Sequence, residues 1–126
     1  MSGGVFIGDG HCSIRLTRDG ERGEIGYPVF VEVKAGSFRG AIDDNVYSFV
    51  EFRKQLASLY ETLEGEAAVQ GLERVSIVLS GTGKGGIEVR VRIVDEYQPL
   101  IELNFTFLID QSYLPSVLQQ IDAEFD

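Results

Sequence analysis

The sequence has little cysteine, few basic residues and no long apolar run, and each shortage excludes a class of protein. Its one cysteine, Cys12, cannot form a disulfide within the chain, which argues against a disulfide-built secreted scaffold. The apolar runs are a few residues long, far short of the roughly 20 that cross a bilayer. The first residues show neither the basic segment nor the apolar stretch of a signal peptide. We therefore expect a cytoplasmic protein with no membrane segment.

Histidine is also scarce, which limits the chemistry that the chain can perform. The only histidine, His11, lies beside Cys12. A metal site generally needs three or four donors, and no such set is recognisable in the sequence. Neighbouring residues of a strand point to opposite faces, so His11 and Cys12 are not expected to act together as base and nucleophile. These shortages predict a protein that is not an enzyme and holds no metal.

The glycine-rich segment 81–86 is the one apparent nucleotide motif. It fits the pattern G-x-G-x-x-G and follows a predicted strand. A dinucleotide site also needs a helix directly after the glycines, because the helix N-terminus binds the pyrophosphate. Residues 87–93 alternate between apolar and polar side chains instead, which predicts a strand. We interpret the segment as a hairpin loop and expect no cofactor.

Basic residues are outnumbered by acidic ones. The chain has 11 Lys and Arg against 20 Asp and Glu, which gives a net charge of −9. A negative surface repels nucleic-acid phosphates and anionic lipids, so neither is an expected partner. It attracts a basic protein and accelerates association with it. The simpler interpretation, that the charge serves solubility alone, stays open.

Two kinds of periodicity predict the fold class of a single domain over residues 1–126. Apolar residues recur every three or four positions over 46–63, which predicts a helix of roughly five turns, and again over 114–125. Elsewhere they alternate with polar residues, which predicts strands. We therefore expect an α+β fold, with an antiparallel sheet (a β-meander in the second half) and with one long central helix and a C-terminal helix packed on one face. The predicted strands cover residues 5–7, 12–17, 28–34, 38–42, 66–69, 75–80, 87–94 and 101–108.

Acidic residues at the ends of the predicted elements are candidate contacts for a partner. Asp43 and Asp44 precede the long helix, whereas Asp95 and Glu96 lie in a predicted hairpin turn. Helix capping and turn formation explain the same residues without any partner. The sequence alone leaves both interpretations open.

The solvent face of the predicted meander is the second candidate surface. One register of its last two strands places Arg92 opposite Glu102, and Arg90 then lies opposite Asn104. Such pairs usually support the sheet. Apolar residues share this face, and a mixture of arginine, polar and apolar side chains is typical either of a protein-binding patch or of a face that other elements cover. These apolar residues are Val78, Val94 and Leu108.

Four segments stand in a characteristic order along the chain. A helix pattern that includes Phe49 and Phe52 is followed at once by Gly65-Glu66-Ala67. The alternating strand that ends in Phe105-Thr106-Phe107 leads directly into Asp110-Gln111-Ser112-Tyr113-Leu114-Pro115. Together they resemble the WapI-like immunity proteins and related small bacterial families over residues 29–121. The shared features are structural, so the resemblance carries over no functional residue.

The resemblance implies a protein that binds and neutralises a cognate contact-dependent toxin, commonly a nuclease, inside the producing cell. The net negative charge suits a basic toxin. We therefore expect a non-enzymatic inhibitor of the immunity type with a protein partner. Two alternatives stay open, namely a structural module that forms homo-oligomers and a domain that binds a small ligand. The candidate contacts are Asp43, Asp44, Arg90, Arg92, Asp95, Glu96 and Glu102.

Overall fold

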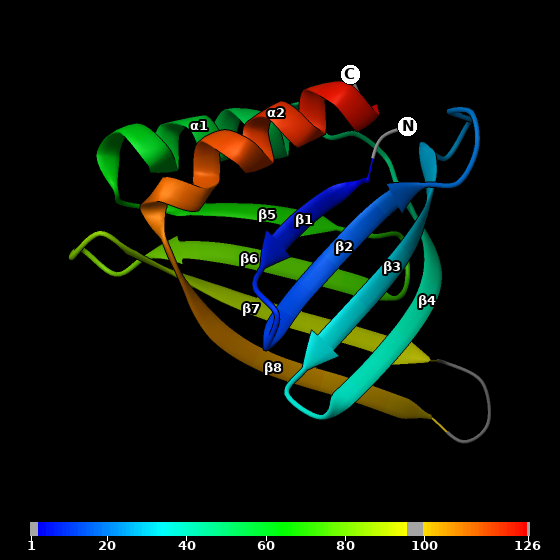
Figure 1. Ribbon diagram of the computed structural model, residues 1–126. Helices are drawn as coiled ribbons and strands as arrows, with labels where there is room; N and C mark the ends of the chain where they lie inside the picture. The colour runs from blue at the N-terminus through cyan, green and yellow to red at the C-terminus, as the bar shows by residue number, and fades with distance from the viewer. Residues whose placement is uncertain (1–2, 96–99, 126) are drawn as a thin grey trace.

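Two antiparallel sheets lie face to face, with the helices along one side (Figure 1). The computed structural model describes residues 3–95 and 100–125. Within these residues each sheet has four strands in sequence order. The strands of the first sheet are β1 (Val5–Gly8), β2 (Cys12–Arg18), β3 (Tyr27–Ala35) and β4 (Phe38–Val46). The strands of the second sheet are β5 (Glu66–Gln70), β6 (Val75–Gly81), β7 (Gly86–Asp95) and β8 (Ile101–Asp110).

The two helices lie side by side across one edge of each sheet (Figure 1). α1 (Val50–Thr62) connects the sheets and packs mainly on β5. α2 (Leu114–Phe125) follows β8 through a 3-10 turn (Gln111–Tyr113) and packs mainly on β1. Aromatic stacking joins the two helical segments, since the ring centres of Phe49 and Phe125 lie 3.8 Å apart. One side of the molecule is therefore closed by helices.

Each helix also caps the main chain of the edge strand beneath it. The side-chain oxygen of Gln120, on α2, accepts a hydrogen bond from the N–H of Phe6 in β1 at 2.8 Å. Gln55, on α1, does the same for the N–H of Ala68 in β5 at 3.0 Å. An uncovered edge strand would leave such groups to solvent or to another chain. The opposite edges, β4 and β8, carry no helix within the described part of the chain (Figure 1).

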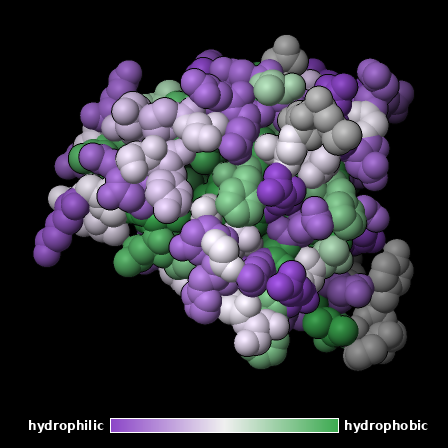
Figure 2. Space-filling model, viewed as in Figure 1, coloured by the Kyte–Doolittle hydropathy of each residue, from purple (hydrophilic) through white to green (hydrophobic). Residues whose placement is uncertain are grey.

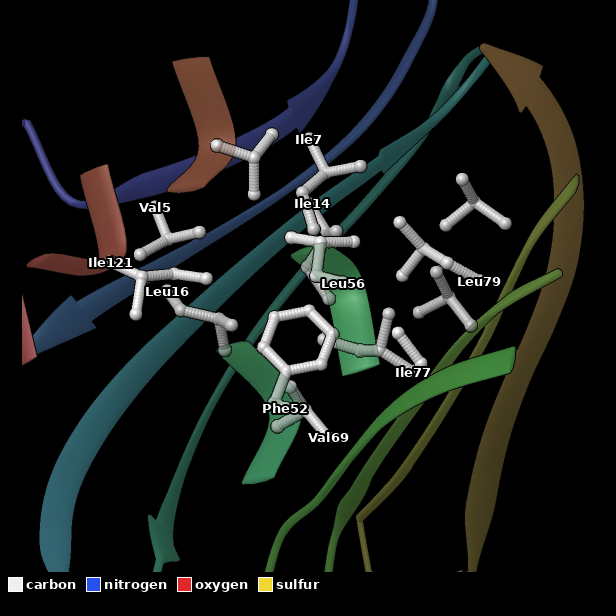
Figure 3. Packing of buried hydrophobic residues seen from close by; sticks show 14 of the residues in the cluster. Val5, Ile7, Ile14, Leu16, Phe52, Leu56, Val69, Ile77, Leu79 and Ile121 are labelled. Atoms are coloured by element: carbon white, nitrogen blue, oxygen red, sulfur yellow. The ribbon is translucent and has the colours of Figure 1, made fainter. Parts of the chain in front are cut away.

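One core lies between the sheets and extends under both helices. Side chains from both sheets meet around Phe52 and Leu56 of α1 (Figure 3). The period of two in the strands and the period of about 3.6 in the helix each place apolar residues on one face, and these faces meet here. Burial of one such side chain stabilises the fold by roughly 1.5–3 kcal/mol. This one core therefore holds the two sheets and the two helices together.

The α+β class and the β-meander of the second half are confirmed, but the arrangement of the elements differs from the prediction. The sequence leaves open whether the first four strands join the meander, and the structure shows that they form a sheet of their own. The helices bridge two sheet edges instead of covering one sheet face. Alternation gives each strand an apolar side, and two sheets that face each other satisfy this pattern as well as one sheet covered by helices does.

The central helix is shorter than the periodicity predicts. α1 has 13 residues, and Val46, the first residue of the predicted helix, lies in β4 opposite Tyr27. Its spacing from the apolar residues of the helix is coincidental. The helix ends at Thr62, and its C-cap residue Leu63 adopts the left-handed conformation with φ of 61°. Tertiary pairing of β4 therefore overrides the local helical pattern.

A buried carboxylate ties the two sheets together at one end. Asp44 lies in β4 and is only 7% exposed. Its carboxylate accepts hydrogen bonds from the N–H groups of Glu73, Arg74 and Val75, at 3.3, 2.8 and 3.0 Å. Gly71 leaves the necessary space, since a Cβ at this position would overlap the carboxylate. The β5–β6 turn of the second sheet is thereby fixed against β4 of the first.

Asp44→Ala is expected to lower the free energy of unfolding by about 3 kcal/mol, because it leaves several N–H groups without their acceptor. Urea unfolding followed by circular dichroism measures this loss. Asp43→Ala is the matched control, since its side chain is exposed, and it should change the value by less than about 0.5 kcal/mol. Equal losses in the two variants would contradict the role of the buried carboxylate.

Candidate partner-binding surface

Three of the predicted contacts lie on the outer face of the second sheet and are engaged in ion pairs. β7 and β8 pair Arg92 with Asn104, so the register expected for Arg92 and Glu102 is wrong by two residues. Arg92 still reaches Glu102 on the diagonal, with N–O distances of 3.0 and 3.2 Å. The hydrogen bonds from Arg92, and then one from Asn104, lower the pKa of the Glu102 carboxyl. Arg90 pairs with Glu66 at 3.2 Å. These pairs cross between strands and support the sheet.

The three apolar residues expected on this face differ in exposure. Leu108 is exposed, Val78 is half-buried and Val94 is buried. The outer face of the second sheet is therefore dominated by its ion pairs. A face of this kind offers a partner few unpaired groups.

The remaining predicted contacts differ in where the structure places them. The carboxylate of Asp44 is used within the chain, as described above. Asp43 and Asp95 are exposed and lie, with Glu102, around a groove between the edges of β4 and β8. Glu96 lies outside the described residues. The structure therefore brings together three of the predicted acidic residues, from two sheets.

The groove occupies the open side of the molecule, opposite the helices. Its volume is about 450 Å³. Gly40 and Ile42 of β4 line one wall, and Ile93 and Leu103 line the other. A Cβ at Gly40 would lie 3.3 Å from the Cδ1 of Ile93, so the missing side chain helps to form the hollow. The rest of its lining is formed by Phe38, Arg39, Ala41, Asp43, Arg74, Asp95, Ile101 and Glu102.

A second exposed surface lies where the β2–β3 loop meets the end of β4 and the β5–β6 turn. The loop approaches β4 so closely that a Cβ at Gly26, whose φ is 94°, would overlap the carbonyl oxygen of Val46. The guanidinium of Arg22 lies 5.8 Å from the ring centre of Tyr27 and 5.6 Å from that of Tyr47. These contacts hold the loop beside β4. We call this area the loop-end surface, and it comprises Asp19, Glu24, Ile25, Asp43, Asn45, Tyr47, Leu72 and Glu73.

Three large apolar side chains are exposed on the loop-end surface. Ile25 is 53% exposed, Tyr47 67% and Leu72 59%. Two hollows of about 300 and 340 Å³ adjoin each other here and share Ile25, Asn45 and Leu72. The N–H of Leu72 donates to the carbonyl oxygen of Asn45 at 2.8 Å, which fixes the leucine between them. On the face of the molecule seen in Figure 2, apolar side chains stand among hydrophilic ones.

The loop-end surface carries more carboxylates than basic groups. Exposed carboxylates of Asp19, Glu24 and Glu73, together with that of Asp43, line the two hollows, whereas the basic groups that the described residues place here are those of Arg74 and of Arg22, which lies beside Tyr47. Exposed apolar groups that are ringed mainly by charge of one sign are suited to bind a partner of the opposite charge. The sequence patterns do not find this surface, because Ile25 and Leu72 stand as single apolar residues within polar segments.

Two other features of the molecule bear on its chemistry. Over residues 3–95 and 100–125, no three side chains of histidine, cysteine, aspartate or glutamate come together as metal ligands. Neither α1 nor α2 has the length and apolar character of a membrane-spanning helix.

The immunity protein WapI-like family matches residues 6–126, which is nearly the whole chain. The match begins within β1 and includes every later strand and both helices. No curated protein sequence matches the chain.

Arg22→Ala is expected to loosen the β2–β3 loop, since an exposed cation over an aromatic ring contributes roughly 0.5–1 kcal/mol. Hydrogen exchange of the main-chain amides of Asp19, Gly23 and Gly26 measures this, because each donates a hydrogen bond that closes the loop. We expect these amides to exchange about fivefold faster. Arg39→Ala, which removes an exposed arginine from β4, should leave them unchanged, and an equal acceleration in both variants would refute the role of Arg22.

Proposed function

The chain belongs to the immunity protein WapI-like family, and from this membership we propose that it binds and neutralises a cognate toxin domain. It acts by occupying a surface of the toxin and performs no reaction of its own. The family match over residues 6–126 is the observation that carries the proposal. The net charge of −9 and the loop-end surface support its finer parts, which are the sign of the partner's charge and the place of contact.

The charge of the loop-end surface favours a basic toxin. A nuclease presents lysine and arginine side chains to the phosphates of its substrate, so its binding cleft is positively charged. The carboxylates of Asp19, Glu24 and Glu73 are suited to pair with such groups. Their field accelerates the encounter, and the effect falls as salt concentration rises. An inhibitor that covers this cleft keeps the nucleic acid away.

The apolar part of the loop-end surface supplies the short-range contact. Leu72 lies between the two hollows, and Ile25 and Tyr47 flank it. Desolvated apolar and aromatic groups near the centre of an interface usually carry most of its binding energy, and a charged rim surrounds them. We therefore assign anchoring to Leu72 and Tyr47, and assign steering to the carboxylates.

The groove between β4 and β8 favours a second candidate function, which is the binding of a small ligand. Its volume of about 450 Å³ is within the range typical of ligand sites. A ligand that binds only the folded state raises the midpoint of thermal unfolding. A thermal-shift screen of a metabolite set against the purified chain tests this alternative, and a shift that Gly40→Leu abolishes would favour it.

The toxin proposal is tested first by finding the partner. Affinity capture of the tagged chain from its native lysate, followed by mass spectrometry, should recover one near-stoichiometric basic protein. The recovered toxin domain is then purified and its activity is measured with and without the chain. Full inhibition at equal concentrations is the expected result, and a captured protein whose toxic activity the chain leaves unchanged would contradict the proposal.

With that toxin domain, Leu72→Ala is expected to raise the dissociation constant at least about tenfold, through loss of an apolar anchor. Glu24→Lys and Glu73→Lys should slow association and weaken its dependence on salt. Surface plasmon resonance at two salt concentrations separates these effects. Leu108→Ala and Glu61→Lys are matched controls, because they change an exposed leucine and an exposed glutamate elsewhere. If Leu72→Ala, Glu24→Lys and Glu73→Lys all bind like the wild type, the proposed contact through the loop-end surface is wrong.

A further inference from the structure

The edge of β4 differs from the edges that the helices cover. Phe6 in β1 and Ala68 in β5 donate their outward N–H groups to glutamines of the helices. β4 has no such cover along its middle, residues 39–42, within the described part of the chain. An uncovered edge strand is a template for pairing with another chain unless it is blocked.

The main chain of Arg39 and Ala41 points away from β3. The carbonyl oxygen of Asn45 accepts from the N–H of Leu72, and that of Asp43 accepts from the guanidinium of Arg74, so both carbonyls face away from β3. Alternate residues of an antiparallel strand direct their main-chain groups to the same side. Arg39 and Ala41 share the parity of Asp43 and Asn45, and no group of the described residues takes their outward N–H or carbonyl.

The side chains of β4 are complementary to those of β4 in a second copy of the chain. If two copies pair antiparallel with Ala41 opposite Ala41, then Arg39 lies opposite Asp43 of the second copy, and the same pair recurs on the other side. On the inner face Gly40 then lies opposite Ile42 of the second copy. Gly40 has no side chain and leaves a hollow in the groove wall, and Ile42 is only half-buried in the single chain. In the pair, the side chain of Ile42 from one copy would face the hollow at Gly40 of the other.

Arg39 lacks an acidic partner in the single chain, and this pairing would supply one. β3 and β4 place Lys34 directly opposite Arg39, but the ammonium of Lys34 donates to the carbonyl oxygen of Gly10. Arg39 forms no ion pair with an acidic residue in the described part of the chain. A carboxylate from a second copy, on the outer side of Arg39, would pair with its guanidinium.

We propose that β4 pairs with β4 of a second copy about a twofold axis at Ala41, which joins the first sheets of two molecules into one continuous sheet. The arrangement is isologous, so it closes at the dimer. The net charge of −9 on each copy opposes association, but at physiological salt the repulsion between distant charges is screened beyond about 8 Å, whereas the paired charges are in contact. The proposal goes beyond the toxin-binding function and is tested with this chain alone.

Sedimentation velocity from about 1 μM to 1 mM protein at physiological salt measures the dimer, and we expect a reversible monomer–dimer equilibrium in this range. Arg39→Asp and Asp43→Arg each put like charges opposite each other twice, so each should raise the dimer dissociation constant about tenfold or more. An equimolar mixture of the two variants restores both opposite-charge pairs, so it should form a heterodimer about as tight as the wild-type dimer. Thermal unfolding confirms that each variant is folded.

Three further variants separate this interface from others. Ala41→Pro removes an outward N–H without removing a donor to β3, and it should abolish the dimer. Lys54→Asp and Glu61→Arg make the same changes in net charge on the exposed face of α1, and they should leave the dissociation constant unchanged. A wild-type chain that stays monomeric at about 1 mM overturns the proposal. So does a dimer that Arg39→Asp and Asp43→Arg do not weaken, or a mixture that fails to restore it.

Discussion

The hydrogen bonds to the carboxylate of Asp44 are the constraint on which the functional surface depends. A buried charge is costly unless donors surround it, and here the N–H groups of the β5–β6 turn supply them. The turn that is fixed in this way also carries Leu72 and Glu73. One buried side chain of the first sheet therefore sets where the second sheet presents its exposed leucine, next to Ile25 and Tyr47.

The two sides of the sandwich have different roles because the helices cover only one of them. On the covered side, Gln55 and Gln120 satisfy the outward main chain of the edge strands, and aromatic rings pack between the helical segments. On the open side lie the groove and the uncovered edge of β4. The loop-end surface lies at one end of the sheets, where the β2–β3 loop, the end of β4 and the β5–β6 turn meet. Such a division leaves a binding surface free to vary without disturbing the core.

The sequence predicts most of the strands and both helices because each of them has a strong local period. It does not predict how many sheets the strands form, since the alternation in 28–34 is the same whether that strand pairs within one sheet or another. Asp44 precedes a helical pattern and so resembles a helix cap, whereas its bonds are to a turn 30 residues away in the sequence. The alternation along the last two strands places Arg92 and Glu102 on the same face, so their ion pair is expected. Alternation does not determine the register of the two strands, so the diagonal geometry of the pair is not predicted. The loop-end surface is missed because it arises only when three distant segments meet.

The packing of α2 on β1 has a consequence for how the chain matures during synthesis. The ribosome makes every strand before it makes α2, which follows β8. Until residues 114–125 emerge, the N–H of Phe6 lacks its glutamine acceptor and the apolar side of β1 lacks its cover. Both sheets consist of consecutive hairpins and are able to form early, but the edge of β1 stays uncovered until α2 has been made. During the interval between the synthesis of β1 and that of α2, the edge of β1 is therefore open to pairing with another chain.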